Sequence, residues 1–117
     1  MNVYDIAHSL ARAIKNSEEY KDYKKKRERV FADKNIKEMV LDFKKKAIEI
    51  QMQRMTGEEV PKERLEKFEK LEEIVMGNPI IYDFFMAEIR LGQMMNDIYE
   101  ILGEAVNMNW GIRDNEK

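Results

Sequence analysis

Apolar residues recur along most of the chain at the three- and four-residue spacing that is typical of helices burying one face. This spacing predicts a first helix over about residues 3–15, with an apolar stripe of Val3, Ile6, Ala7, Leu10, Ala13 and Ile14. Ser17 precedes two glutamates and predicts an N-cap, because its hydroxyl can accept hydrogen bonds from free backbone amides. A second helix, with a thinner stripe, is therefore expected to run to about Ala32.

Two longer helices are predicted farther along the chain, over about residues 33–56 and 79–108. Asp33 predicts the N-cap of the first of these, and Gly57 its C-terminal end. Its apolar residues step by four and three, as in a coiled-coil seam: Ile36, Val40, Phe43, Ala47 and Ile50. A flanking row widens this surface: Met39, Leu41, Ile48, Met52 and Met55. The second long helix repeats the spacing in Phe84, Glu88, Leu91, Met95, Ile98, Leu102 and Ala105.

Glycine and proline mark a short helix between the two long ones. Pro61 favours the first position of a helix, where its missing amide would be unpaired anyway, and Gly77-Asn78-Pro79 ends this helix and starts the next. The predicted fold class is all-α, with about five helices, in which the two long helices form an antiparallel bundle and the oligomer core. Residues 1–110 are expected to form a single helical domain, and residues 111–117 a disordered tail.

The lengths of the two long helices predict self-association. At 1.5 Å per residue they reach roughly 35 and 45 Å, which is longer than a compact domain of this size needs. Their projecting apolar rows would be exposed unless a second chain covered them, so we expect a homodimer or a higher even oligomer. The residues predicted to form its interface are Ile36, Val40, Phe43, Ile50, Phe84, Leu91, Met95, Ile98 and Leu102.

Composition excludes most enzyme classes. The 117 residues include no cysteine and one histidine, His8, which lies off the apolar stripe and is expected to face solvent. A di-metal bundle needs Glu-x-x-His pairs, and these are absent. We therefore predict no enzyme, no catalytic residue, no cofactor and no metal. The sequence also predicts neither a signal peptide nor membrane insertion, so the expected location is the cytoplasm.

The net charge of −2 hides an uneven distribution. Residues 1–46 hold 13 basic and 8 acidic side chains, whereas residues 47–117 hold 8 and 15. Attraction between helices is the favoured interpretation, and a basic face for a polyanion is the alternative. Its candidate contacts are Lys24, Lys25, Arg27 and Arg29, which form a collar around a helix and not a stripe along it. The acidic pI of about 5.6 argues against non-specific affinity for nucleic acid.

Three further features have a structural and a functional interpretation. The nine methionines lie mostly on apolar rows, which favours core or oligomer packing over a groove for a partner protein. Trp110 is expected to cap the end of a neighbouring helix, and the alternative is a hot spot for binding a partner. Arg54 and Glu88 extend otherwise apolar rows, so they could pair as a buried ion pair across a dry interface, unless helix drift brings one of them to the surface.

A family resemblance covers roughly Val3 to Met108. The residues that carry it are Tyr4-Asp5-x-Ala7, Ser17-Glu18-Glu19-Tyr20, Ala32-Asp33, Gly57-Glu58-Glu59 and Ala87-Glu88-x-Arg90. In their order and spacing the chain resembles the YheA family of small bacterial proteins, within the YlbF/YmcA superfamily. The resemblance implies an all-helical cytoplasmic oligomer, and YheA-type members have no established biochemical activity.

The better-known superfamily members suggest a regulatory role. YlbF and YmcA act with YaaT in a complex that influences competence, sporulation, biofilm formation and RNA processing, and such complexes carry iron–sulfur clusters on cysteines. This chain has no cysteine, so cluster binding does not carry over. We predict a non-enzymatic helical oligomer that binds itself and another regulatory protein. The alternatives are a nucleic-acid-binding accessory protein and a holdase-like chaperone.

Overall fold

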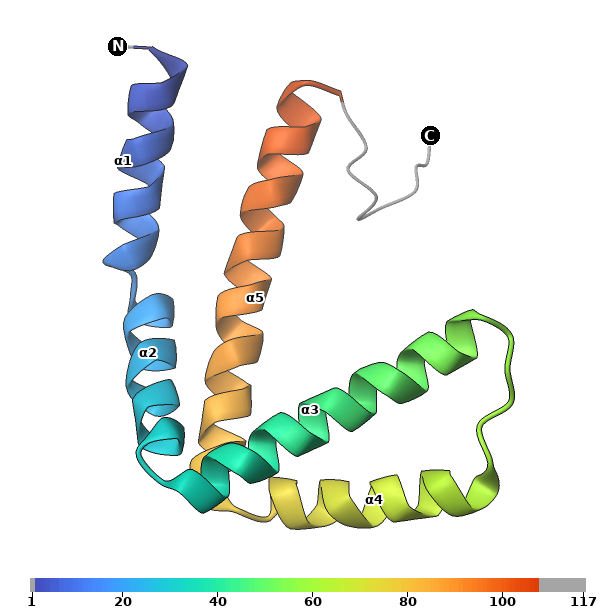
Figure 1. Cartoon of the computed structure of the whole chain (residues 1–117). Helices are drawn as coiled ribbons and strands as arrows, with labels where there is room; N and C mark the ends of the chain where they lie inside the picture. The colour runs from blue at the N-terminus through green and yellow to red at the C-terminus, as the bar shows by residue number, and fades with distance from the viewer. Residues whose placement is uncertain (1, 108–117) are drawn as a thin grey trace. The chain divides into compact units, whose positions relative to one another are not determined.

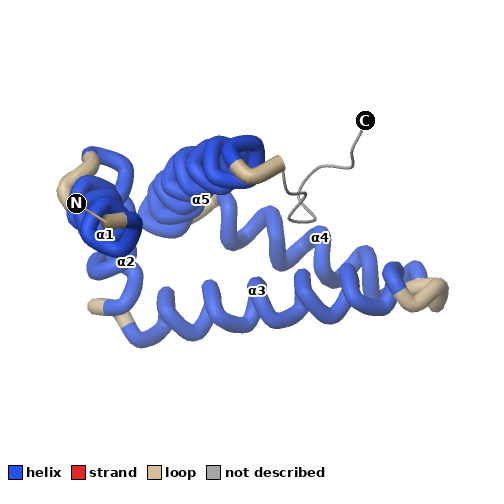
Figure 2. The backbone as a smooth tube through the Cα atoms, turned by 90° about the horizontal axis from the view of Figure 1, so that it is seen from above, coloured by secondary structure: helices blue, strands red, loops and turns tan. Residues whose placement is uncertain are grey.

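The computed structural model describes residues 2–107 and contains five α-helices, with no strand in that range (Figures 1 and 2). The helices are α1 (Val3–Lys15), α2 (Glu18–Phe31), α3 (Lys34–Met55), α4 (Lys62–Met76) and α5 (Pro79–Ala105). This confirms the predicted all-α class. The predictions for Trp110 and for the tail at residues 111–117 lie outside the described residues. No helix within residues 2–107 combines the length and apolar character needed to cross a bilayer.

Side-chain caps start the helices where the sequence predicts them. The Ser17 hydroxyl accepts from the Tyr20 amide at 3.1 Å. One Asp33 carboxylate oxygen accepts from the amides of Asn35 and Ile36, at 2.9 and 3.1 Å. Asn78 caps α5 in the same way, with Pro79 at the first helical position. Each cap satisfies backbone donors that have no partner inside the helix.

The turn between α3 and α4 follows the prediction with one shift. Gly57 has a φ of +85°, the left-handed conformation that glycine adopts without steric cost. Pro61, however, lies at the N-cap of α4 and not at its first helical position. Its ψ of 140° is extended, while its carbonyl already accepts from the Leu65 amide at 3.1 Å. The helix therefore begins one residue later, at Lys62.

Residues 24–86 form one of two compact units, called the central unit. It contains α3 and α4, which pack against each other as a hairpin (Figure 1). The C-terminal part of α2 and the first turns of α5 also belong to it. The Phe43 ring stacks on Phe68 with centroids 5.1 Å apart, and it lies 5.8 Å from Phe85. Val40, Ile50, Val75 and Ile81 complete the buried apolar set together with Val30, Val60, Phe84 and Phe85.

Polar contacts reinforce the turn end of the hairpin. Arg64 Nη1 on α4 donates to Gln53 Oε1 on α3 at 2.6 Å, and Arg64 Nη2 lies 3.6 Å from Glu49 Oε1. Gln53 also donates to the Glu59 carbonyl at 3.5 Å. These exposed contacts add less stability than the aromatic contacts, but they hold the turn beside α3.

The pairing of the long helices differs from the prediction. We expected α3 and α5 to form an antiparallel bundle, whereas the helix that packs along α3 in the central unit is α4. The physical reason is the six-residue connection at residues 56–61, which brings α4 back along α3 before α5 begins. Only residues 79–86 of α5 belong to this unit, and Phe84 and Phe85 contribute its last aromatic layer.

The other compact unit, called the terminal unit, is described over residues 2–23 and 87–107. It contains α1, the first turns of α2 and most of α5. None of the residues of α1 is buried, although the helix has a clear apolar stripe. Burial in this unit is concentrated on α5, at Ala87 and Gly103. The prediction of a single domain over residues 1–110 stays a prediction.

Candidate functional site

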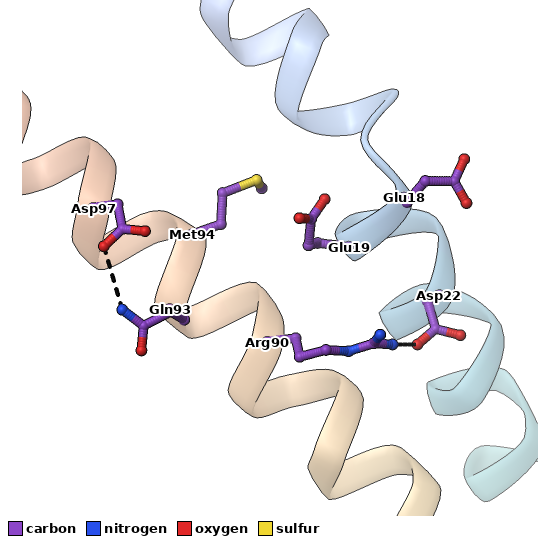
Figure 3. A pocket seen from close by; sticks show the side chains of 7 residues that line it. All are labelled: Glu18, Glu19, Asp22, Arg90, Gln93, Met94 and Asp97. Atoms are coloured by element: carbon purple, nitrogen blue, oxygen red, sulfur yellow. Dashed lines mark hydrogen bonds and ion pairs between the residues drawn. The ribbon is translucent and has the colours of Figure 1, made fainter.

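The terminal unit contains a groove of about 530 Å³ between α2 and α5 (Figure 3). The Ser17 cap fixes where α2 begins, and this places Glu18, Glu19 and Asp22 on the first turns of that helix. The opposite wall comes from successive turns of α5: Arg90, Gln93, Met94 and Asp97.

Charge in the groove is mostly negative. Arg90 forms an ion pair with Asp22, and Gln93 Nε2 donates to Asp97 Oδ1 at 3.2 Å. Four carboxylates thus line the groove with a single guanidinium. The lining contains carboxylates, a guanidinium, an amide and a thioether, but no hydroxyl, thiol or imidazole. Within residues 2–107, no three histidine, cysteine or acidic side chains converge on a metal-binding position.

Sequence reasoning did not find this groove. Asp22 and Arg90 lie 68 residues apart, and no spacing rule links them. The available signals were the acidic first turn of α2 and the Ala87-Glu88-x-Arg90 motif, which entered only through the family resemblance. A contact between two helices that are distant in the chain can be identified only once the fold is known.

The apolar stripe of α1 is exposed. Val3 is 78% exposed, Ile6 is 54% exposed and Leu10 is 36% exposed. Near its end α5 also exposes Ile101 and Leu102, and Val106 is exposed just after the helix. Contiguous apolar surface on a small protein typically marks a site of interaction with another protein.

The predicted polyanion contacts lie on α2 in the central unit. Lys24, Lys25 and Arg29 are exposed. The Arg27 guanidinium lies 4.1 Å from the centre of the Phe31 ring, a cation–π contact within its own helix. All four side chains are therefore exposed, and Arg27 in addition contacts an aromatic ring.

The predicted oligomer interface divides into two groups. Val40, Ile50 and Phe84 are buried inside the central unit, and Ile36 and Phe43 are half-buried there. Their own chain covers them, so their apolar spacing is already explained by intramolecular packing. Leu91, Met95 and Ile98 on α5 are half-buried, and Leu102 is exposed. Periodicity alone does not distinguish burial within a chain from burial between chains. The interface itself stays a prediction.

The remaining predicted residues are placed individually. Arg54 is exposed near the end of α3, whereas Glu88 on α5 is half-buried. They belong to different compact units, and their ion pair stays a prediction. His8 is exposed on α1, as expected for a histidine off the apolar stripe.

Comparison with known proteins identifies relatives over nearly the whole chain. A family model described as control of competence regulator ComK, YlbF/YmcA, matches residues 3–107. A UPF0342 protein from Halothermothrix orenii is 41% identical over 117 residues, covering 100% of this chain and 98% of the relative. Another UPF0342 protein, from Symbiobacterium thermophilum, is 40% identical and covers 92% and 96% of the two chains.

Two solved structures share the fold. A protein of unknown function from Bacillus stearothermophilus, DUF964, superposes with a TM-score of 0.75 at 17% identity, covering 90% of this chain and 92% of that one. A chain of the crystal structure of Bacillus subtilis RicA in complex with RicF superposes with a TM-score of 0.63 at 22% identity, covering 90% of this chain and 93% of that one. These likenesses support the all-helical fold.

Proposed function

The chain belongs to the YlbF/YmcA family of competence-control regulators, and on that premise we propose that it is a helical regulatory protein that acts by binding other proteins. Its partners are further copies of the same chain and another regulatory protein. Catalysis has no part in this role. The narrower likeness to YheA and a cytoplasmic location belong to the same proposal.

The observation that carries the proposal is the exposed face of α1. An isolated helix of 13 residues is marginally stable in water, and in proteins it gains most of its stability by burying an apolar face. None of the residues of α1 is buried within the chain, although Val3, Ile6 and Leu10 share one face. A partner that covers this face would supply the missing burial.

A related fold supports the choice of a protein partner. A chain that shares this fold was solved in the complex of Bacillus subtilis RicA with RicF. The family description likewise points to regulation and names no catalytic activity. The groove on α2 and α5 offers carboxylates, an amide and a guanidinium, which can bind polar or charged groups of a partner protein.

The experiment is a mass measurement by light scattering on the full chain at micromolar concentration. We expect a particle of at least twice the 14.0 kDa of one chain. The variant Ile6→Glu should lower that mass, because a carboxylate in an apolar contact costs several kcal/mol. His8→Glu introduces the same charge on the polar side of α1 and should leave the mass unchanged. A mass of 14.0 kDa for the unaltered chain throughout the range would contradict the proposed self-association.

A further inference from the structure

The α3 helix has a second apolar face beside the one that its own chain covers. The buried and half-buried residues, here called the inner row, are Ile36, Val40, Phe43, Ala47 and Ile50. On another side of the helix, four large apolar residues are 47–77% exposed: Leu41, Ile48, Met52 and Met55. With Lys45 they form the outer row, because 41, 45, 48, 52 and 55 are separated by four, three, four and three residues.

The spacing of the outer row is that of a helix–helix seam. Residues separated alternately by four and three positions stay on one side of a helix and can interdigitate with an equivalent row of another helix. The inner row has the same spacing and is already packed within the central unit. The outer row is therefore a second seam on α3, about 21 Å long from Leu41 to Met55 at 1.5 Å per residue.

The charged residues next to the outer row favour one orientation when two α3 helices pair. Lys45 lies within the row and is exposed. Glu49 is exposed at its edge, one turn later, where its carboxylate also lies 3.6 Å from Arg64 Nη2 of its own chain. In a parallel pair of α3 helices, each Lys45 would lie level with the partner's Lys45, and these like charges would repel. In an antiparallel pair, each Lys45 lies level with the partner's Ile48, next to the partner's Glu49, and the opposite charges attract.

We propose that the outer row packs against the outer row of a second copy of this chain, with the two α3 helices antiparallel. The two-fold axis then passes beside Lys46 and Ala47. In this register Leu41 faces the partner's Met52 and Lys45 is level with the partner's Ile48, while Met55 lies beyond the paired rows, level with the partner's Glu38. A single lysine in an otherwise apolar seam sets register and orientation at some cost in stability. The pairing rests on the proposed self-association and adds a second contact surface to the exposed face of α1.

Cysteine cross-linking tests the register directly, because the chain has no cysteine of its own. In the double variant Leu41→Cys/Met52→Cys, each cysteine faces its counterpart in the antiparallel pair, so mild oxidation should give a covalent dimer. In the single variant Leu41→Cys, the two cysteines lie about 16 Å apart along the seam, and a disulfide cannot bridge more than about 7 Å between Cα atoms. The single variants should therefore stay uncross-linked. Efficient cross-linking of Leu41→Cys alone would show a parallel pair and overturn the proposal.

Charge reversal tests the complementarity in solution. Lys45→Glu should raise the dissociation constant of the dimer about tenfold, because it places two carboxylates next to each other. The double variant Lys45→Glu/Glu49→Lys restores opposite charges and should recover most of the affinity. Lys70→Glu on α4 makes the same charge change away from the outer row and serves as the control. Equal effects of Lys45→Glu and Lys70→Glu would overturn the proposed contact.

The outcomes separate this proposal from the proposed function. If the unaltered chain self-associates and Ile48→Glu leaves its mass unchanged, the α3 pairing is wrong, while self-association stands. If Ile6→Glu on α1 then lowers the mass, assembly uses the terminal unit instead. If the unaltered chain has a mass of 14.0 kDa at every concentration, both proposals are overturned.

Discussion

Single side chains at the helix ends stabilise the fold by accepting hydrogen bonds from unpaired backbone amides. The Asp33 carboxylate accepts two amide hydrogen bonds at the start of α3, which is also the helix of both apolar rows. We expect Asp33→Ala to lower the free energy of unfolding by about 1 kcal/mol, measured by urea denaturation. Asp33→Asn keeps an oxygen that can accept the same bonds and should stay within a few tenths of the unaltered chain. An equal loss in both variants would contradict a capping role.

Two glycines make a matched pair for testing backbone conformation. No atom lies within 4 Å of a Cβ added at Gly57 or at Gly92, so neither substitution creates a clash. Gly57 has a φ of +85°, and we expect Gly57→Ala to destabilise the protein by about 1 kcal/mol. Gly92 lies inside the helical α5, and Gly92→Ala should stabilise it by about 0.5–1 kcal/mol. Opposite shifts of the thermal midpoint would confirm this difference, and shifts of the same sign would contradict it.

At the scale of elements, aromatic packing connects three helices of the central unit. Phe43 on α3 contacts Phe68 on α4 and Phe85 on α5. Because Phe43 is half-buried, we expect Phe43→Ala to cost about 3 kcal/mol, the lower end of the range for such truncations. Phe43→Leu retains most of the volume and should cost less than about 1.5 kcal/mol. Denaturant titration measures both, and similar losses would show that volume is unimportant at this position.

Helix boundaries were the part of the fold most open to prediction. Ser17, Asp33 and Asn78 mark helix starts through local hydrogen bonds, and these bonds involve residues two or three positions away. Which helices pack against each other was harder to predict from the sequence. The inner row of α3 indicated an apolar partner, but its spacing fits α4, α5 or a second chain equally well.

The candidate site was predicted less completely than the fold, for the same physical reason. Arg90 and Asp22 meet only because α2 and α5 approach each other within the terminal unit. Charged residues on a helix are usually solvated, so neither had a signal of its own in the sequence. The apolar stripe of α1 could be recognised in the sequence, but only the structure shows that none of its residues is buried.

At the scale of the whole molecule, charge is divided between the two compact units. Residues 24–86 contain 15 basic and 13 acidic side chains, whereas residues 2–23 and 87–107 contain 4 and 8. The unit that holds the candidate polyanion contacts is therefore only weakly positive, and acidic residues are interspersed among its lysines. Such a surface gives little of the phosphate neutralisation on which affinity for nucleic acid depends.

We accordingly expect no saturable binding of single-stranded RNA or of duplex DNA at about 50 mM salt, measured by fluorescence anisotropy. Removal of Lys24, Lys25 and Arg29 together should leave that result unchanged. Binding that weakens with a log–log slope of roughly −0.7 to −0.9 per contact, and that is lost in the triple variant, would instead favour the nucleic-acid accessory role.

The hairpin of α3 and α4 has a consequence for how the chain folds. Its two helices are joined by only six residues, so their contacts close short loops, whereas Asp22 and Arg90 must close a loop of 68 residues. Contacts between residues that are near in sequence lower the entropic barrier to folding. The central hairpin should therefore be structured in the folding transition state, while the contact between α2 and α5 forms late. During synthesis the hairpin can assemble before α5 is complete, so the contact between Phe43 and Phe68 can form before the groove between α2 and α5 exists.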